Sequence, residues 1–416
     1  MTQTMLSRVA PAEAEKQHCV VQQTYDILTQ EYMRWMNEGM DVLLSEFSYF
    51  LPSIPPCRYL QQHKTLSGHN SKVTDIAFSP DSYMIFSVCT DGFGIIWDLL
   101  SGLKLQAISL DFPWAMACAY SPSGRIVALG GLENKCSIYT VNVDQNLSPA
   151  ARTNNIPLKH KTSKSFGAQH KALINSMEFL SNNELITASG DSVIRLWDVE
   201  KLRKVCEFVA HSLDVLSVLK VTGDTATPWN FFSSSCDGTV RYWDSRDPNP
   251  VQTLQTELGN INVVALHPDG NCVVIGDELG ECRMYDLRSV CMLESYDIQE
   301  QFQYKNNASY GPMPSSEYDL KTLPPTPRSP GSTLTEDKYS VGGVTSIDIS
   351  KSGRVMYACY SEYGCIAWDL FQRKIIEKIG SGRYAHRDRI SLVKVSGDGQ
   401  ALATASWDST VKIWTI

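Results

Sequence analysis

The sequence predicts an all-β protein, a propeller of seven small sheets preceded by an N-terminal helical segment. Seven β-rich stretches each close on an aromatic residue, at nearly regular spacing. Within a stretch, short apolar runs such as Val73–Phe78 and Met84–Val88 are separated by turn formers, here Ser79-Pro80-Asp81. A four-stranded sheet cannot bury both of its faces alone, so we expect the seven sheets to stack around a ring.

The closing aromatics define the repeat. They are Trp97, Tyr139, Trp197, Trp243, Tyr285, Trp368 and Trp414. Consecutive members lie 42 to 46 residues apart, except for intervals of 58 and 83 residues, and this period is typical of WD repeats. We therefore expect a propeller over 58–416 with insertions at about 144–165 and 297–340. The segment from Arg58 to Leu66 is predicted to supply the outer strand of the last sheet.

A polar set recurs at matched offsets in four of the repeats. The sets are His69, Ser87, Asp91, Trp97; His170, Thr187, Asp191, Trp197; His211, Ser233, Asp237, Trp243; and His386, Thr404, Asp408, Trp414. We expect each Asp to cap a turn and hold the His, whose other nitrogen meets the hydroxyl that is bonded to the indole N–H. At the Asp position the other three repeats carry Glu133, Leu279 and Glu362, so their networks are predicted to be incomplete.

A His, Ser and Asp triplet is also the pattern of a hydrolase with a serine nucleophile. Four copies favour a structural role, because a catalytic triad is needed once, and no GxSxG motif accompanies any copy. The sequence therefore predicts no catalytic residues.

The segment 1–57 has a different pattern. Helix formers dominate from Glu13 to about Tyr49, before three prolines end the stretch. An alternating spacing of four and three residues, typical of a coiled-coil seam, joins Val21, Tyr25, Leu28, Tyr32 and Trp35. We expect this helix to pair with another chain; the alternative is a helix packed on its own propeller.

Composition limits the function classes. The formal net charge of −8 opposes phosphate, so nucleic acid is not expected as a principal partner. Twelve cysteines without a CxxC pair predict neither a zinc site nor a disulfide framework, and no metal or cofactor is expected. Without an 18-residue apolar run, a signal peptide or a lipidation motif, membrane association is expected only through lipidated partners.

The two predicted insertions differ in character. The segment 297–340 is rich in proline and poor in large aliphatic residues, so we expect it to be disordered. Thr326 and Ser329 each precede a proline and are candidate phosphorylation sites, although such dipeptides also arise by chance in proline-rich loops. The segment 144–165 is interpreted as a solvated basic loop.

Several short segments of the sequence resemble one protein family. The stretch AISLDFPWAMACAYSPSGRIVALGGLENKCSIY, from Ala107 to Tyr139, closely resembles the second blade of heterotrimeric G-protein beta subunits. Similar agreement is found in SKSGR at 350–354, ECRMYDLR at 281–288 and ASWDSTVKIW at 405–414. Together with the N-terminal helical segment, the resemblance covers nearly the whole chain outside the insertions.

The resemblance implies a non-enzymatic binding platform at the inner face of the plasma membrane. It implies a gamma subunit along the N-terminal helix, a GDP-bound alpha subunit on the narrow face of the ring, and effectors, a scaffold or a kinase, on the same face after release. This chain has no GxxxxGK[ST] loop, so nucleotide belongs to the alpha subunit. The long helix and the proline-rich insertion resemble a fungal subunit of a pheromone pathway. The alternative is an adaptor of another signalling or ubiquitin-ligase complex.

The resemblance also implies an alpha-binding surface. Its matching positions are Lys72, Ile95, Lys104, Trp114, Met116, Leu132, Asn134, Asp214, Leu216, Cys236, Asn262, Glu278, Arg389 and Trp407. Trp114 and Trp407 are not closing aromatics, so packing does not require them, and exposed tryptophans are typical interface anchors. We expect Leu132, Met116 and Ile95 to form an apolar centre and the charged members to form its rim. The chain departs from the family pattern at Leu173, Asn260 and Ser361.

Overall fold

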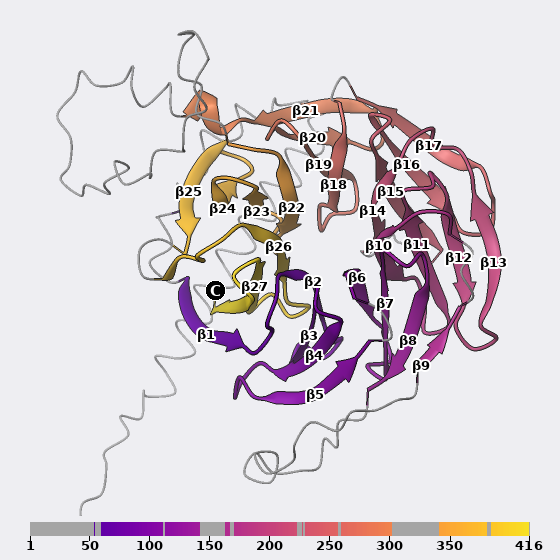
Figure 1. Ribbon diagram of the computed structural model, residues 1–416. Coiled ribbons are helices and arrows are strands. Elements are labelled where there is room, and N and C mark those ends of the chain that lie inside the picture. The colour runs from indigo at the N-terminus through magenta and orange to yellow at the C-terminus, as the bar shows by residue number, and fades with distance from the viewer. Residues whose placement is uncertain are drawn as a thin grey trace, which may run out of the picture. The chain divides into compact units, whose positions relative to one another are not determined.

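A computed structural model describes residue 54 and residues 60–110, 113–141, 163–166, 170–222, 227, 229–256, 259–301, 341–380 and 384–415. Within these ranges the chain forms seven antiparallel sheets of four strands each, arranged around a ring (Figure 1). The predicted fold class is thus confirmed. The predicted helix, with Val21, Tyr25, Leu28, Tyr32 and Trp35, lies outside the described residues, and so do Thr326 and Ser329.

Six sheets, called blades 1 to 6, each consist of four consecutive strands from the centre of the ring outwards. Blade 1 contains β2 (Val73–Phe78), β3 (Met84–Cys89), β4 (Phe93–Asp98) and β5 (Lys104–Ser109). Blade 2 contains β6 (Ala115–Tyr120), β7 (Ile126–Gly131), β8 (Cys136–Thr140) and β9 (Ser163–Ser165). Blade 3 contains β10 (Ile174–Phe179), β11 (Glu184–Ser189), β12 (Ile194–Asp198) and β13 (Arg203–Phe208).

The second half of the ring repeats this order. Blade 4 contains β14 (Val215–Lys220), β15 (Asn230–Ser235), β16 (Thr239–Asp244) and β17 (Pro250–Gln255). Blade 5 contains β18 (Ile261–Leu266), β19 (Cys272–Asp277), β20 (Cys282–Asp286) and β21 (Cys291–Tyr296). Blade 6 contains β22 (Val344–Ile349), β23 (Val355–Tyr360), β24 (Gly364–Asp369) and β25 (Lys374–Ile379).

Blade 7 closes the ring with strands from both ends of the propeller. It joins β26 (Ile390–Val395), β27 (Ala401–Ser406) and β28 (Thr410–Thr415) to β1 (Gln61–Ser67) as its outer strand. Leu66 pairs with Val411 and is fully buried. The outer strand expected from Arg58 to Leu66 is present as β1 over Gln61–Ser67, and it ties the start of the ring to its end.

The structure corrects the bounds of both expected insertions. Residues Ser163–Ser165 form β9 and pair with β8, although we placed them inside the insertion at 144–165. The predicted bounds left blade 2 with only three strands, and this short segment supplies its fourth. At the other insertion, Ile298 is buried in the core and the Gln301 side-chain amide donates a 2.7 Å hydrogen bond to the Arg373 carbonyl. These contacts place residues 297–301 in the propeller.

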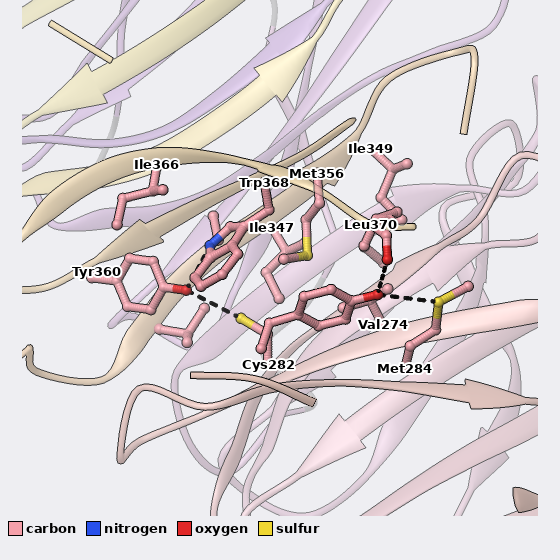
Figure 2. Packing of buried hydrophobic residues seen from close by; sticks show 14 of the residues in the cluster. Val274, Cys282, Met284, Ile347, Ile349, Met356, Tyr360, Ile366, Trp368 and Leu370 are labelled. Atoms are coloured by element: carbon pink, nitrogen blue, oxygen red, sulfur yellow. Dashed lines mark hydrogen bonds between the residues drawn. The ribbon is translucent and has the colours of Figure 1, made fainter. Parts of the chain in front are cut away.

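The hydrophobic core lies between neighbouring blades, as the packing of blade 5 on blade 6 illustrates (Figure 2). Trp368 and Tyr296 meet edge to face with ring centroids 5.9 Å apart, and the Tyr296 hydroxyl donates a 2.8 Å hydrogen bond to the Leu370 carbonyl. Blade 6 has Ala358 where blades 1, 3, 4 and 7 carry a hydroxyl residue. The Trp368 indole N–H instead donates to the Tyr360 hydroxyl at 3.2 Å, so this blade satisfies its buried indole by another route.

Candidate functional site

The recurring polar sets form buried hydrogen-bond networks in blades 4 and 7. In blade 4, His211 lies 2.9 Å from Asp237 through Nδ1 and 2.7 Å from Ser233 through Nε2, and the Trp243 indole N–H donates to Ser233 at 2.8 Å. The equivalent distances in blade 7, for His386, Asp408, Thr404 and Trp414, are 2.9, 2.9 and 3.0 Å. Each network fixes the entry to the inner strand against the turn between the second and third strands.

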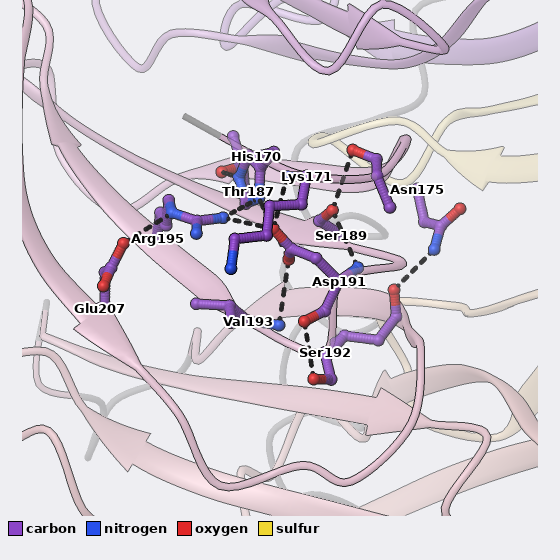
Figure 3. Close-up of polar contacts among 12 residues, drawn as sticks. His170, Lys171, Asn175, Thr187, Ser189, Asp191, Ser192, Val193, Arg195 and Glu207 are labelled. Carbon is purple, nitrogen blue, oxygen red and sulfur yellow. Dashed lines mark hydrogen bonds and ion pairs between the residues drawn. The ribbon is translucent and has the colours of Figure 1, made fainter. Parts of the chain in front are cut away.

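In blade 3 the network extends to the outer strand (Figure 3). His170 bonds Thr187 at 2.7 Å and lies 3.3 Å from Asp191, and the Trp197 indole N–H donates to Thr187 at 2.8 Å. Arg195 adds hydrogen bonds to Asp191 at 2.8 Å and to Glu207 at 2.9 Å. Because the side chains of Arg195 and Asp191 are nearly buried, their guanidinium and carboxylate are far more favourable as a pair than either charge alone.

Blade 1 departs from the expected network. His69 bonds Ser87 at 2.7 Å, and the Trp97 indole N–H donates to Ser87 at 2.8 Å, but His69 Nδ1 has no hydrogen-bond partner. Asp91 instead accepts a hydrogen bond from the Cys89 thiol. The expectation that Asp91 holds His69 is therefore wrong, and the reason is Cys89, which stands where the other three blades carry Ser189, Ser235 and Ser406.

The burial of these sets also decides their chemistry. The hydroxyl-bearing residues Ser87, Thr187, Ser233 and Thr404 are all 0% exposed. A serine nucleophile must reach a substrate carbonyl, and none of these four hydroxyls reaches solvent. The four sets are therefore scaffold elements.

Seven equivalent backbone hydrogen bonds define one edge of the ring, which we call the paired edge. In each blade, the first residue after the second strand donates its N–H to the carbonyl of the residue before the inner strand, at 2.9 to 3.3 Å. The donor and acceptor pairs are Thr90 and Lys72, Leu132 and Trp114, Gly190 and Leu173, Cys236 and Asp214, Glu278 and Asn260, Ser361 and Gly343, and Trp407 and Arg389. Most of the candidate alpha-contact positions belong to these pairs.

Each inner strand carries a register irregularity directly inside this edge, at its second residue. In five blades the side chain of that residue donates to the first carbonyl of the next inner strand, at 2.7 to 3.2 Å. The donors are Thr74, Asn175, Asn262, Thr345 and Ser391. These bonds set the starts of neighbouring inner strands side by side, so the seven pairs face the same side of the ring.

Met116 and Leu216 occupy this second position in blades 2 and 4. Both are partly exposed and neither can donate the hydrogen bond that the other five residues make. Apolar side chains at two positions where the scaffold uses polar ones point to a role in binding. The Asn262 amide, by contrast, already bonds the Val344 carbonyl at 2.9 Å, so scaffold geometry accounts for that residue.

Trp407 is the centre of a stacked group on the paired edge. The Lys72 ammonium lies 3.8 Å from the centroid of its ring, and the Arg389 guanidinium carbon lies 5.0 Å away. Both cations are exposed and Trp407 is partly exposed. Two cations on one indole hold the ring in place while leaving their charge available to an acidic partner.

Trp114 contributes a second aromatic to this edge. Its side chain is 50% exposed, and its backbone adopts a φ of 62°, a left-handed conformation that is rare for bulky residues. A strained backbone beneath an exposed aromatic side chain is typical of a functional surface, because burial of that side chain does not offset the energy of the strain. The neighbouring Leu132 is 48% exposed and continues the apolar area.

The remaining candidates divide into three kinds. Asp214 and Glu278 are exposed carboxylates, and Cys236 is partly exposed. Asn134 has a φ of 61° at the turn position where blades 1, 4 and 5 use glycine, so the turn itself explains its identity. Lys104 is exposed, but it begins the outer strand β5 and is not a member of the paired edge.

Ile95 does not form the exposed apolar centre that we expected. It lies in β4, is 4% exposed and packs with Leu66 and Val411 in the core between blades 7 and 1. Its side chain is needed to close the ring, so it is not accessible to a partner in this structure.

Two exposed leucines beside the paired edge were missed by sequence reasoning. Leu279 is 72% exposed in the turn after β19, and Leu213 is 52% exposed just before Asp214. Leu279 stands at the position of the network aspartate, and an aliphatic residue at a position that should face polar partners was the available signal. The three departures, Leu173, Asn260 and Ser361, are all members of the paired edge.

Comparisons with known proteins define the class first. The family model described as "WD domain, G-beta repeat" matches residues 60–98, 161–198, 202–244 and 379–415. A solved structure titled as the WD40 beta propeller domain of Doa1 superposes with a TM-score of 0.61 at 16% identity, covering 85% of this chain and 96% of that one. The protein is therefore a WD-repeat β-propeller.

Closer relatives give the particular family. The chain is 36% identical to a guanine nucleotide-binding protein subunit beta of Saccharomyces cerevisiae, over 86% of this chain and 80% of that protein. It is 34% identical to the subunit beta of Oryza sativa subsp. japonica, over 84% of this chain and 82% of the relative. The chain belongs to the family of guanine nucleotide-binding protein beta subunits. Among the described residues, no helix has the length and apolar character that a membrane span needs.

Proposed function

We propose that this chain, as a heterotrimeric G-protein beta subunit, holds a GDP-bound alpha subunit on the paired edge and engages effectors there after alpha leaves. The observation that carries the proposal is the stacked group of Trp407, Lys72 and Arg389. It offers a large indole with fixed orientation, flanked by two cations, and such residues dominate interface energetics. Trp114, Met116, Leu132, Leu216 and the two exposed leucines at 213 and 279 extend this surface.

The scaffold under this surface supports control by competition. Seven paired bonds and the networks of blades 3, 4 and 7 fix the ends of the blades, so we expect the edge to keep its shape when a partner binds. A rigid surface cannot signal by changing conformation. It signals by being covered or uncovered, and the nucleotide held by alpha decides which.

The gamma subunit completes the proposal. The 4,3 spacing of Val21, Tyr25, Leu28, Tyr32 and Trp35 fits a helix that pairs with a second helix. We propose that a lipidated gamma subunit binds there and brings the complex to the inner face of the plasma membrane. The beta chain itself acts without catalysis or cofactor, and a fungal pheromone pathway is the proposed setting, since the yeast relative is compatible with it.

The proposal is tested by reconstitution. The full chain is co-expressed with a candidate gamma subunit, and binding of the purified pair to immobilised alpha is measured with GDP and with a non-hydrolysable GTP analogue. We expect tight binding with GDP and at least about tenfold weaker binding with the analogue. Equal binding in both states, or no dependence on gamma for soluble yield, would favour the adaptor function instead.

A further inference from the structure

Blade 1 differs from its three sister networks in a way that creates a set of metal-ligand atoms. A ring nitrogen of His69, Cys89 Sγ and a carboxylate oxygen of Asp91 all lie within 4.8 Å of one another. His69 is 6% exposed, and its Nδ1 is buried without a hydrogen-bond partner. In the sister blades the same nitrogen is taken by the aspartate at 2.9 to 3.3 Å. A buried imidazole nitrogen aimed at a thiol and a carboxylate is an unsatisfied group that requires an explanation.

We propose that blade 1 holds a divalent transition-metal ion, with Zn²⁺ as the fitting occupant, on His69 Nδ1, Cys89 Sγ and the Asp91 carboxylate. A nitrogen, a sulfur and an oxygen ligand form a donor set that Zn²⁺ accepts, with one tetrahedral position left for water. Asp91 is partly exposed in the turn after β3, which gives the ion a route from solvent. Calcium and magnesium, which prefer oxygen ligands alone, do not fit this set.

The hydrogen bonds around His69 suit this role. The Ser87 hydroxyl occupies one ring nitrogen of His69, and the other is buried without a hydrogen bond. With its proton on Nε2, the ring donates to the Ser87 hydroxyl oxygen at 2.7 Å and leaves the Nδ1 lone pair free. Metal-bound histidines commonly donate their other N–H to such a second partner, which fixes the ring.

Metal binding balances as a proton exchange. The Cys89 thiol, which now donates to Asp91, loses its proton to solvent, and the metal takes the place of that proton between sulfur and carboxylate. Nothing is oxidised or reduced. The positive charge of the Lys104 ammonium acts on His69 and would repel a bound metal ion. Lys104→Met should therefore tighten metal binding.

The sister blades supply the matched variant. Ser189, Ser235 and Ser406 occupy the position of Cys89, and each donates to a main-chain carbonyl at 3.1 to 3.2 Å. Cys89→Ser therefore removes the sulfur ligand while installing the residue that three blades already tolerate. Cys236→Ser removes a partly exposed thiol from the equivalent edge of blade 4 and serves as the control.

The test uses the full chain, stripped with a chelator and titrated with Co²⁺ and then Zn²⁺. We expect the wild type and Cys236→Ser to bind one more equivalent of metal than Cys89→Ser and to show a sulfur-to-cobalt charge-transfer band that Zn²⁺ abolishes. Zn²⁺ should raise the melting temperature of the wild type and not that of Cys89→Ser. Asp91→Asn, which keeps the turn acceptor, should bind Zn²⁺ at least about tenfold more weakly. Equal stoichiometry and spectra in wild type and Cys89→Ser, or equal Zn²⁺ affinity in wild type and Asp91→Asn, would overturn the proposal.

Discussion

Asp91 and Asp237 stand at the same position in two blades but serve different partners. Asp237 bonds His211 Nδ1 at 2.9 Å and also accepts the Thr239 hydroxyl at 2.6 Å, whereas Asp91 bonds the Cys89 thiol and leaves the nitrogen of His69 without a hydrogen bond. The spacing from the aspartate to the closing tryptophan is six residues in both cases. The contribution of each carboxylate to the stability of the fold therefore depends on the residue two positions before it, Cys89 in blade 1 and Ser235 in blade 4.

Removal of these two carboxylates should have unequal effects. Asp237→Ala leaves a buried imidazole N–H unsatisfied and should lower the free energy of unfolding by about 1 to 3 kcal/mol. Asp91→Ala breaks no bond to its histidine, so its cost in metal-free protein should be about 1 kcal/mol smaller. Urea unfolding of the two variants measures the difference. An equal loss would show that His69 depends on Asp91 after all.

The Asp237 carboxyl should also give the fold a defined acid sensitivity. Burial acts to raise its pKa, but hydrogen bonds from Thr239, His211 and the Ser212 N–H outweigh burial and lower the pKa from 3.8 to about 2. Because the folded-state pKa lies below the unfolded one, the carboxylate stabilises the fold fully above about pH 4, and this contribution is lost as pH falls towards 2. The stability advantage of wild type over Asp237→Asn should therefore shrink between about pH 5 and pH 2. A constant advantage across this range would show that Asp237 has an ordinary pKa.

At the scale of single elements, the outer strand β1 decides whether the ring is closed. Its pairing with β28 joins segments more than three hundred residues apart in sequence, and Leu66 packs there with Ile95 and Val411. This contact also explains the burial of Ile95, since one core has to bridge the first and last blades. An unclosed ring would expose two sheet edges.

Truncation of Leu66 tests this closure. Leu66→Ala should lower the free energy of unfolding by about 2 to 5 kcal/mol, because it leaves a cavity in a core with no exposed side. His63→Ala, an exposed change in the same strand, should cost no more than about 0.5 kcal/mol. Differential scanning calorimetry of both variants compares them. Equal melting temperatures would mean that β1 contributes little to the stability of the ring.

The elements also show where sequence reasoning succeeds and where it ends. The closing aromatics and the recurring His, Asp and Trp offsets are local patterns, so they predicted seven blades and the strand before the first repeat. The short strand β9 has no such pattern, since Ser163–Ser165 is polar and only its pairing with β8 makes it a strand. Likewise, the hydrogen bond from the Asn262 side chain, at a register irregularity, to the Val344 carbonyl depends on a neighbour that is distant in sequence.

The whole molecule joins these parts into a fixed surface. The family resemblance supplied most of the surface positions, and the structure describes two of them in detail: Trp407 carries two cations close to its ring, and Trp114 is strained and exposed. The structure removes Ile95 from the surface, because it is buried in the core that closes the ring. The exposure of Leu213 could not be read from the sequence, because an apolar residue in a turn gives no sign of which way it faces, whereas Leu279 carried a signal in its place at the network aspartate position. A rigid ring whose paired edge carries exposed aromatic, aliphatic and charged side chains suits a protein whose partners bind the same surface in turn.

The most direct test of this account is the affinity of the Trp407→Ala chain, paired with its gamma subunit, for the GDP-bound alpha subunit. Removal of the stacked indole should weaken binding by about 2 kcal/mol or more, a roughly 30-fold rise in Kd, with an unchanged melting temperature. The control is Tyr83→Ala, which removes an exposed aromatic from the turn between β2 and β3 at the other end of those strands and should leave Kd unchanged. A wild-type Kd for Trp407→Ala would contradict the assignment of the paired edge as the alpha-binding surface.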